Sequence, residues 1–357
     1  MKETPSNVHT PIRLTYHCTQ ACMFCGISEK KSEESSQPKG LMEQLAELRQ
    51  HTDVVTLSGG EPTLSPYLLE CVREAYRLDF RRIAIQSNGS FENAEEPCSD
   101  QNDVQRAKLI ALRDAGMTEV QVSIHSMNTD CQAYLTGRKQ SSDYAFHLLS
   151  TARRLAIPAS VNTVITRSNY RELALLPAPL AGAEVKAWHL VWPQVIGRAR
   201  INFARIVPTL SIAVPYMLHA VAKAESRSLK ASITGVPHCL LGPYVRIATE
   251  AAAGPTRFAT KCSRCSLRSR CSGLDPRYMA RFGDGELRPQ RLPPSDNAFE
   301  STSSEKQMGT MSTPPTGWGA LFELEPSETD PNAEEKGREV RLALPVVREV
   351  SPKEKKD

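Results

Sequence analysis

The stretch Cys18-Thr19-Gln20-Ala21-Cys22-Met23-Phe24-Cys25, called the cysteine loop below, determines how this chain is interpreted. Its cysteines are spaced Cys-x3-Cys-x2-Cys, and thiolate is the soft ligand that iron–sulfur clusters require. Three thiolates on one short loop can hold three corners of a cubic cluster. The fourth iron is then open to a small chelating ligand and can pass an electron to it. The alternative is a zinc loop, for which a fourth Cys or His is expected at finger-like spacing.

The cysteine loop comes directly after an apolar run, Ile12–Tyr16, that predicts a β-strand. Five similar runs predict further strands at Val54–Leu57, Ile83–Ile85, Val120–Ile124, Val161–Ile165 and Trp188–Trp192. Patterns of helical period lie between them, at Leu41–Leu48, Tyr67–Leu78, Val104–Ala115, Tyr144–Leu155 and Leu173–Leu180. This alternation favours βαβ units and a parallel sheet, so we expect an α/β fold with a partial (β/α)6 barrel of TIM type.

A glycine-rich turn, Ser58-Gly59-Gly60-Glu61-Pro62-Thr63, follows the second predicted strand. Gly59 and Gly60 allow a ligand to approach the backbone closely, and Pro62 fixes the turn. Glu61 can accept hydrogen bonds from an ammonium group. Because parallel strands end at one edge of a sheet, we expect this turn and the cysteine loop at the same mouth.

A second group of cysteines lies far downstream, where Cys262-x2-Cys265-x5-Cys271 is preceded by Cys239. Four thiolates can fill all four irons of a cubane cluster. Cys-x2-Cys spacing also suits a structural zinc site with four cysteine ligands. The residues alone leave both interpretations open.

The length and composition of the 357-residue chain limit the classes of protein to which it can belong. The length suffices for a large core and a smaller appended unit. No stretch approaches the roughly 20 apolar residues of a membrane span, and the N-terminus lacks a secretory pattern. We therefore expect a cytoplasmic protein, with no membrane partner, whose cysteines bind metal rather than form disulfides. The sequence contains no Lys/Arg block with interleaved aromatic residues, which is the pattern that would indicate nucleic-acid binding.

The two leading motifs resemble those of the radical S-adenosylmethionine (SAM) superfamily. The cysteine loop resembles that family's cluster motif, and Gly59-Gly60-Glu61-Pro62 resembles its motif for the SAM amino group. The resemblance implies an enzyme in which Cys18, Cys22 and Cys25 hold a catalytic [4Fe-4S] cluster whose open iron binds SAM. Reductive cleavage of SAM then yields a 5′-deoxyadenosyl radical that abstracts hydrogen from a substrate.

The same resemblance implies further contacts with SAM from polar residues at strand ends. These are Ser87, Asn88, Ser123, Arg138 and Asn162. Near the end of the sixth strand, His189 and Trp192 either face the substrate or belong to the core.

The downstream cysteines resemble the auxiliary-cluster domains known as SPASM and, in a shorter form, twitch. The longer form has another cysteine where this chain has Asp275, so the shorter form is implied. It would hold one further [4Fe-4S] cluster on Cys239, Cys262, Cys265 and Cys271. We accordingly expect a radical SAM core at residues 10–205, a helix with the auxiliary domain at 206–290, and a disordered tail at 291–357.

The leading hypothesis for the substrate is a ribosomally made peptide in a maturation pathway, because one-chain architectures of this kind commonly act on peptides. The alternatives are dehydrogenation or rearrangement of a small metabolite, and a non-catalytic iron–sulfur electron-transfer protein. A reductant such as flavodoxin or ferredoxin is an expected partner. The first strand begins near Pro11, so a leader-peptide-binding protein is expected to be a separate chain.

Overall fold

The computed structural model describes residues 11–27, 38–91, 101–249 and 256–291. These residues belong to one compact unit, Met1–Asp296. All but the first residue of the predicted tail, 291–357, lies outside the described residues.

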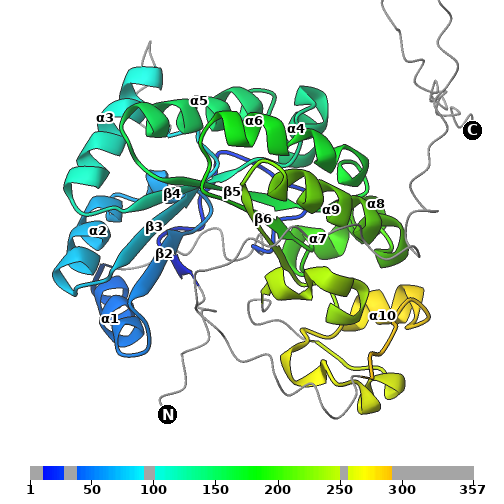
Figure 1. The fold of residues 1–357 in the computed structure, drawn as a ribbon. Coiled ribbons are helices and arrows are strands. Elements are labelled where there is room, and N and C mark those ends of the chain that lie inside the picture. The colour runs from blue at the N-terminus through cyan, green and yellow to red at the C-terminus, as the bar shows by residue number, and fades with distance from the viewer. Residues whose placement is uncertain (1–10, 28–37, 92–100, 250–255, 292–357) are drawn as a thin grey trace, which may run out of the picture. The chain divides into compact units, whose positions relative to one another are not determined.

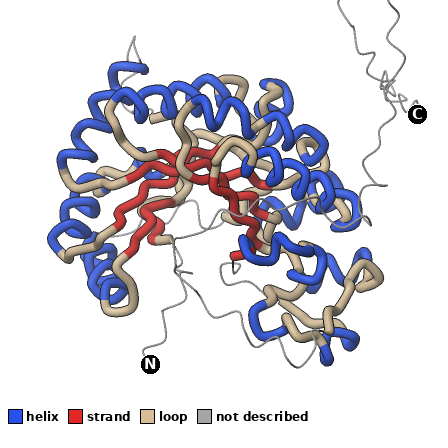
Figure 2. The backbone as a smooth tube through the Cα atoms, in the orientation of Figure 1, coloured by secondary structure: helices blue, strands red, loops and turns tan. Residues whose placement is uncertain are grey.

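One parallel sheet forms the centre of this unit, with its eight strands in sequence order. The strands lie in an arc, and helices form a layer around its outer side (Figures 1 and 2). The predicted α/β half-barrel is therefore confirmed, with two strands beyond the six expected. The strands are β1 Ile12–Arg13, β2 Val54–Ser58, β3 Arg82–Ser87, β4 Glu119–Ser123, β5 Ala159–Val164, β6 Ala187–Val191, β7 Lys230–Thr234 and β8 Ala248–Thr249.

Apolar runs form the central strands because helices cover their outer face. In β2 and β3, Val55 lies opposite Ile83 and Leu57 opposite Ile85, and all four side chains are fully buried. Near-continuous runs of this kind are typical of parallel strands. The first strand is shorter than predicted: pairing ends at Arg13, and Leu14 N donates to Ser58 O at 2.8 Å before the chain enters the loop.

Four of the five predicted helical patterns are confirmed, and the fifth differs. The expected helix Leu173–Leu180 is divided into a 3-10 helix, Tyr170–Leu175, and a short α-helix that starts at Pro177. Proline lacks the N–H that a continuous helix needs at this point. The α-helices are α1 Pro38–Arg49, α2 Leu68–Arg77, α3 Gln101–Asp114, α4 Thr129–Thr136, α5 Ser141–Arg154, α6 Pro177–Gly182, α7 Gly197–Ile201, α8 Phe203–Ile206, α9 Leu210–Glu225 and α10 Pro276–Phe282.

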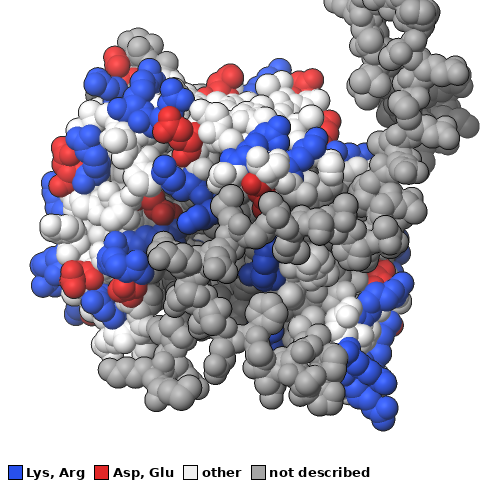
Figure 3. All heavy atoms as spheres, viewed as in Figure 1, with Lys and Arg blue, Asp and Glu red and all other residues white. Residues whose placement is uncertain are grey.

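The surface carries charges of both signs. On the face in Figure 3, Lys and Arg alternate with Asp and Glu over the helices. Lys and Arg also gather at the lower right on residues 256–291, called the cysteine-rich segment below. In the sequence from Thr256 to Arg291, nine Lys/Arg accompany three Asp/Glu. Within the described part of the chain, no helix is both long and apolar enough to cross a bilayer.

Candidate functional site

The cysteine loop follows β1 at the C-terminal edge of the sheet and is held from two sides. Ala21 N and Met23 N donate to Thr136 O and Leu135 O, each at 2.9 Å, at the end of α4. On the other side, Asn202 Nδ2 donates to Met23 O at 3.2 Å. The loop thus has a fixed backbone that does not depend on regular secondary structure of its own.

The three thiols of this loop lie close enough to affect one another electrostatically. The pKa of Cys18 is raised to about 11, mainly because the thiol is buried. Burial also raises the pKa of Cys22. The charge of Cys25 raises the pKa of both further, because neighbouring thiolates repel one another. Backbone amides of Gln20 and Ile27 donate to the sulfurs of Cys18 and Cys25, each at 3.4 Å. Thiolates gathered in this way are stabilised by a bound metal centre, which holds its ligands deprotonated.

The glycine-rich turn after β2 packs directly on the chain that leads into the cysteine loop. Gly60 N donates to Thr15 O at 2.8 Å, and Glu61 N donates to His17 O at 2.7 Å. A Cβ on Gly60 would lie 2.1 Å from His17 O, and one on Gly59 would lie 2.5 Å from Thr15 O. The structure therefore explains why glycine is needed at both positions: the backbone of the turn lies too close to the chain leading into the cysteine loop to leave room for a side chain.

The carboxylate of Glu61 is fully buried and accepts hydrogen bonds from the chain itself. Its Oε1 accepts from Thr63 Oγ1 and from Ser87 Oγ, each at 2.8 Å, and its Oε2 accepts from Asn88 N at 2.8 Å. Burial raises the pKa of Glu61, and these hydrogen bonds oppose that rise. Glu61 thus links the turn after β2 to the end of β3. Pro62, buried beside it, begins the 3-10 helix Pro62–Leu64.

Two further predicted residues reach the cysteine loop from other elements. Asn88 Nδ2, after β3, donates to Thr19 Oγ1 at 3.0 Å and to Cys18 Sγ at 3.7 Å. Arg138, after α4, donates from Nη1 to Thr19 O at 3.1 Å, and its guanidinium lies 5.3 Å from the centre of the Tyr144 ring. Asn88 and Arg138 are thereby brought to the same loop as the three cysteines.

Ser123 and Asn162 belong to a row of polar residues across neighbouring strands. Asn162 pairs with Ser123 on one side and with His189 on the other, and His189 pairs with Ser232 of β7. His189 Nδ1 and Ser232 Oγ are 2.7 Å apart. Sequence reasoning missed Ser232 because β7 was not predicted, although its alternating pattern Lys-Ala-Ser-Ile-Thr was a usable signal.

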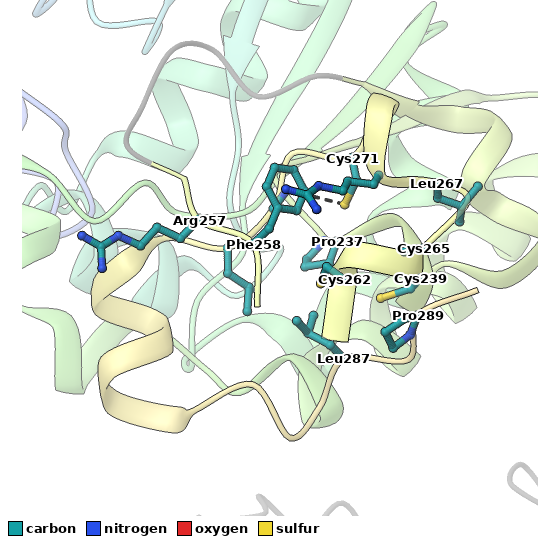
Figure 4. A pocket seen from close by; sticks show the side chains of 13 residues that line it. Pro237, Cys239, Arg257, Phe258, Cys262, Cys265, Leu267, Cys271, Leu287 and Pro289 are labelled. Atoms are coloured by element: carbon teal, nitrogen blue, oxygen red, sulfur yellow. Dashed lines mark hydrogen bonds between the residues drawn. The ribbon is translucent and has the colours of Figure 1, made fainter. Parts of the chain in front are cut away.

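The four downstream cysteines line one pocket (Figure 4). Cys239 lies in the 3-10 helix His238–Leu240, Cys262 in Thr260–Arg264, Cys265 directly after the latter, and Cys271 directly after Arg268–Arg270. Burial raises the pKa of Cys239, and the charges of the other three cysteines raise it further. Tertiary structure thus brings Cys239 to the group, more than twenty positions away in the sequence.

This cysteine-rich segment is anchored on the half-barrel through α10. Arg277 Nη1 donates to Val195 O, and Leu210 N donates to Tyr278 Oη at 2.7 Å. The rings of Tyr278 and Trp192 meet edge to face at 6.2 Å. A pocket open to solvent lies at this junction, and Trp192, Thr234 and Gly273 contribute to its lining. Trp192 is therefore both largely buried and part of a pocket wall.

The donor sets of both cysteine groups fit iron–sulfur clusters. Each group gathers thiols whose mutual charge raises the cost of ionisation, and the second group lies in a segment rich in Lys and Arg. Within the described ranges, no three His, Cys, Asp or Glu side chains converge on a point that could hold one metal ion. A cubane has a different requirement, because each thiolate binds a different iron.

An α/β half-barrel with a three-cysteine loop at the carboxyl edge of its sheet defines the class of protein. Residues 12–175 match the Radical SAM superfamily. The chain thus carries a radical SAM domain over residues 12–175. The family uses a [4Fe-4S] cluster and SAM, as the predicted roles of Cys18, Cys22 and Cys25 require.

Individual relatives share the domain at low identity. A GTP 3′,8-cyclase of Aquifex aeolicus is 27% identical over 165 residues, which are 44% of this chain and 47% of the relative. A PqqA peptide cyclase of Methylorubrum populi is 25% identical over 213 residues, or 57% and 50% of the two chains. The chain thus spans about half the length of these curated relatives. The crystal structure of Streptococcus suis SuiB bound to precursor peptide SuiA matches with 13% identity and a TM-score of 0.49, over 62% of this chain and 47% of SuiB.

Proposed function

We propose that this protein is an enzyme that cleaves SAM reductively and abstracts hydrogen from a substrate. The observation that carries the proposal is the meeting of the cysteine loop, the Gly59–Glu61 turn and Asn88 at one edge of the sheet. When bound, the cluster and SAM supply a 5′-deoxyadenosyl radical that removes hydrogen from an unreactive carbon.

The chain's own residues hold and orient these groups. Cys18, Cys22 and Cys25 provide the thiolates. Glu61 fixes the backbone of Asn88 and the hydroxyl of Ser87, and this network in turn positions the amide that reaches Cys18 Sγ. We assign contacts with SAM to the predicted set, Gly59, Gly60, Glu61, Pro62, Ser87, Asn88, Ser123, Arg138 and Asn162.

A second [4Fe-4S] cluster on Cys239, Cys262, Cys265 and Cys271 is part of this proposal, in a twitch-like domain. The shared pocket supports it, and the excess of nine Lys/Arg over three Asp/Glu offsets the negative charge of four thiolates. Iron analysis separates the alternatives. Two cubanes give about eight iron atoms per chain, whereas a structural zinc site gives about four with one zinc.

The lining of the pocket at the junction is most consistent with a peptide substrate. The described residues that line the pocket at the junction include Trp192, Tyr278 and Asp275 and no Lys or Arg. Such a wall accepts an uncharged or cationic side chain, whereas a nucleoside triphosphate requires cationic partners. Similarity to a PqqA peptide cyclase points the same way. A reductant such as flavodoxin or ferredoxin, a separate leader-peptide-binding protein and a cytosolic location complete the proposal.

A second candidate is the conversion of a small metabolite. It is favoured by similarity to a GTP 3′,8-cyclase. The sequence identity to that enzyme is 27%, slightly more than the 25% identity to the peptide cyclase. Incubation of the reduced enzyme with GTP or with candidate peptides, followed by mass spectrometry of each substrate, separates the two.

The test of the activity itself is anaerobic reconstitution of the full chain with iron and sulfide. After addition of dithionite and SAM, we expect 5′-deoxyadenosine in the wild type. The triple variant C18A/C22A/C25A should form none and should keep the metal of the second site, which serves as its folding control. Cleavage of SAM by this variant would refute the assignment of the catalytic cluster.

A further inference from the structure

Helix α7 lies directly against the cysteine loop, although it begins 172 positions after Cys25 in the sequence. Arg198 N donates to Cys25 O at 2.9 Å. Gly197 has a φ of +54°, and a Cβ there would lie 2.7 Å from Cys25 O. The start of α7 is therefore fixed on the backbone of the third cysteine.

The side chain of Arg198 is half-buried. Its Nε is enclosed and has no hydrogen-bond partner among the described residues. Its positive charge interacts electrostatically with the thiols of both Cys18 and Cys22. An enclosed guanidinium N–H without an acceptor is costly, unless an anionic group occupies the site when the protein is loaded.

The loaded cysteine loop supplies such a group. A cubane on three thiolates is negatively charged, and reduction adds one more negative charge. We propose that the Arg198 guanidinium stabilises the reduced form of the catalytic cluster and so raises its midpoint potential. This inference rests on the proposed function, because it requires a cluster on Cys18, Cys22 and Cys25. Arg138, by contrast, directs its guanidinium at Thr19 O and the Tyr144 ring.

The test is a redox titration of the reconstituted full chain, followed by electron paramagnetic resonance. Signals of the second site are identified in C18A/C22A/C25A and subtracted. In R198Q, we expect at least a tenfold fall in the equilibrium constant for reduction, which is 59 mV for a one-electron couple. R198K keeps the charge and should stay close to the wild type. R200Q removes an exposed arginine of the same helix and should not shift the potential.

The outcomes distinguish failure of this inference from failure of the proposed function. An unchanged potential in R198Q overturns it, and so does weaker binding of SAM with no change in potential, which would make Arg198 a ligand of SAM. If R198Q loses the first cluster while R198K holds it with the wild-type potential, the cluster requires a positive charge at this position, and this outcome supports the inference. Loss of the first cluster in both variants overturns the inference, because it shows a steric role. A wild type that assembles no cluster on the cysteine loop refutes the proposed function instead.

Discussion

The substitution Gly60→Ala tests the contact between the glycine-rich turn and the cysteine loop. A Cβ at this position would lie 2.1 Å from His17 O, whereas ordinary contact begins at 3.4 Å, so turn and loop must separate by about 1.3 Å. That movement breaks the bonds from Gly60 N to Thr15 O and from Glu61 N to His17 O, which are 2.8 and 2.7 Å long. A buried group left without a partner costs roughly 1–3 kcal/mol, so with one such group counted for each of the two bonds we expect a loss of roughly 2–6 kcal/mol.

The assay is urea unfolding of the metal-free full chain, followed by far-UV circular dichroism. G60A should lower the midpoint clearly. The matched control is G40A in α1, where a Cβ would meet nothing within 4 Å. Alanine is favoured over glycine in a helix by up to about 1 kcal/mol, so G40A should leave the midpoint unchanged or raise it. A G60A midpoint equal to that of the wild type would refute the argument from close approach.

Two further predictions concern the core. Trp188→Phe removes the hydrogen bond from Trp188 Nε1 to Thr163 Oγ1 (2.8 Å), so thermal unfolding should show a loss of roughly 1–3 kcal/mol; an unchanged melting temperature would contradict this. Burial lowers the pKa of His125 from 6.5 to about 3, so only the unfolded chain gains a proton on this side chain as the pH falls through that window. Unfolding free energy should therefore decrease by about 1.4 kcal/mol per pH unit below pH 6.5, and urea titrations of His125→Gln should show a smaller slope.

The strands were predictable because each is a short apolar run, and such runs are determined locally. Five of the six predicted strands agree with the structure to within about two residues at each end. The missed strand β7, Lys230–Thr234, has a single fully buried residue, Ile233, because its other face is polar. Without an apolar run, its place in the sheet depends on pairing with β6.

The sequence determined the chemistry that is available: three thiols on one loop, four more downstream, and a glycine-rich turn after a strand. Ligand type and short spacing are local properties that need no fold to be recognised. Tertiary structure decided which groups act on those thiols. The bonds of Glu61 to Ser87 and Asn88 and the approach of Arg198 to Cys25 join segments that are distant in the sequence. They exist because parallel strands end at one edge of the sheet, where the loops that follow them must pack together.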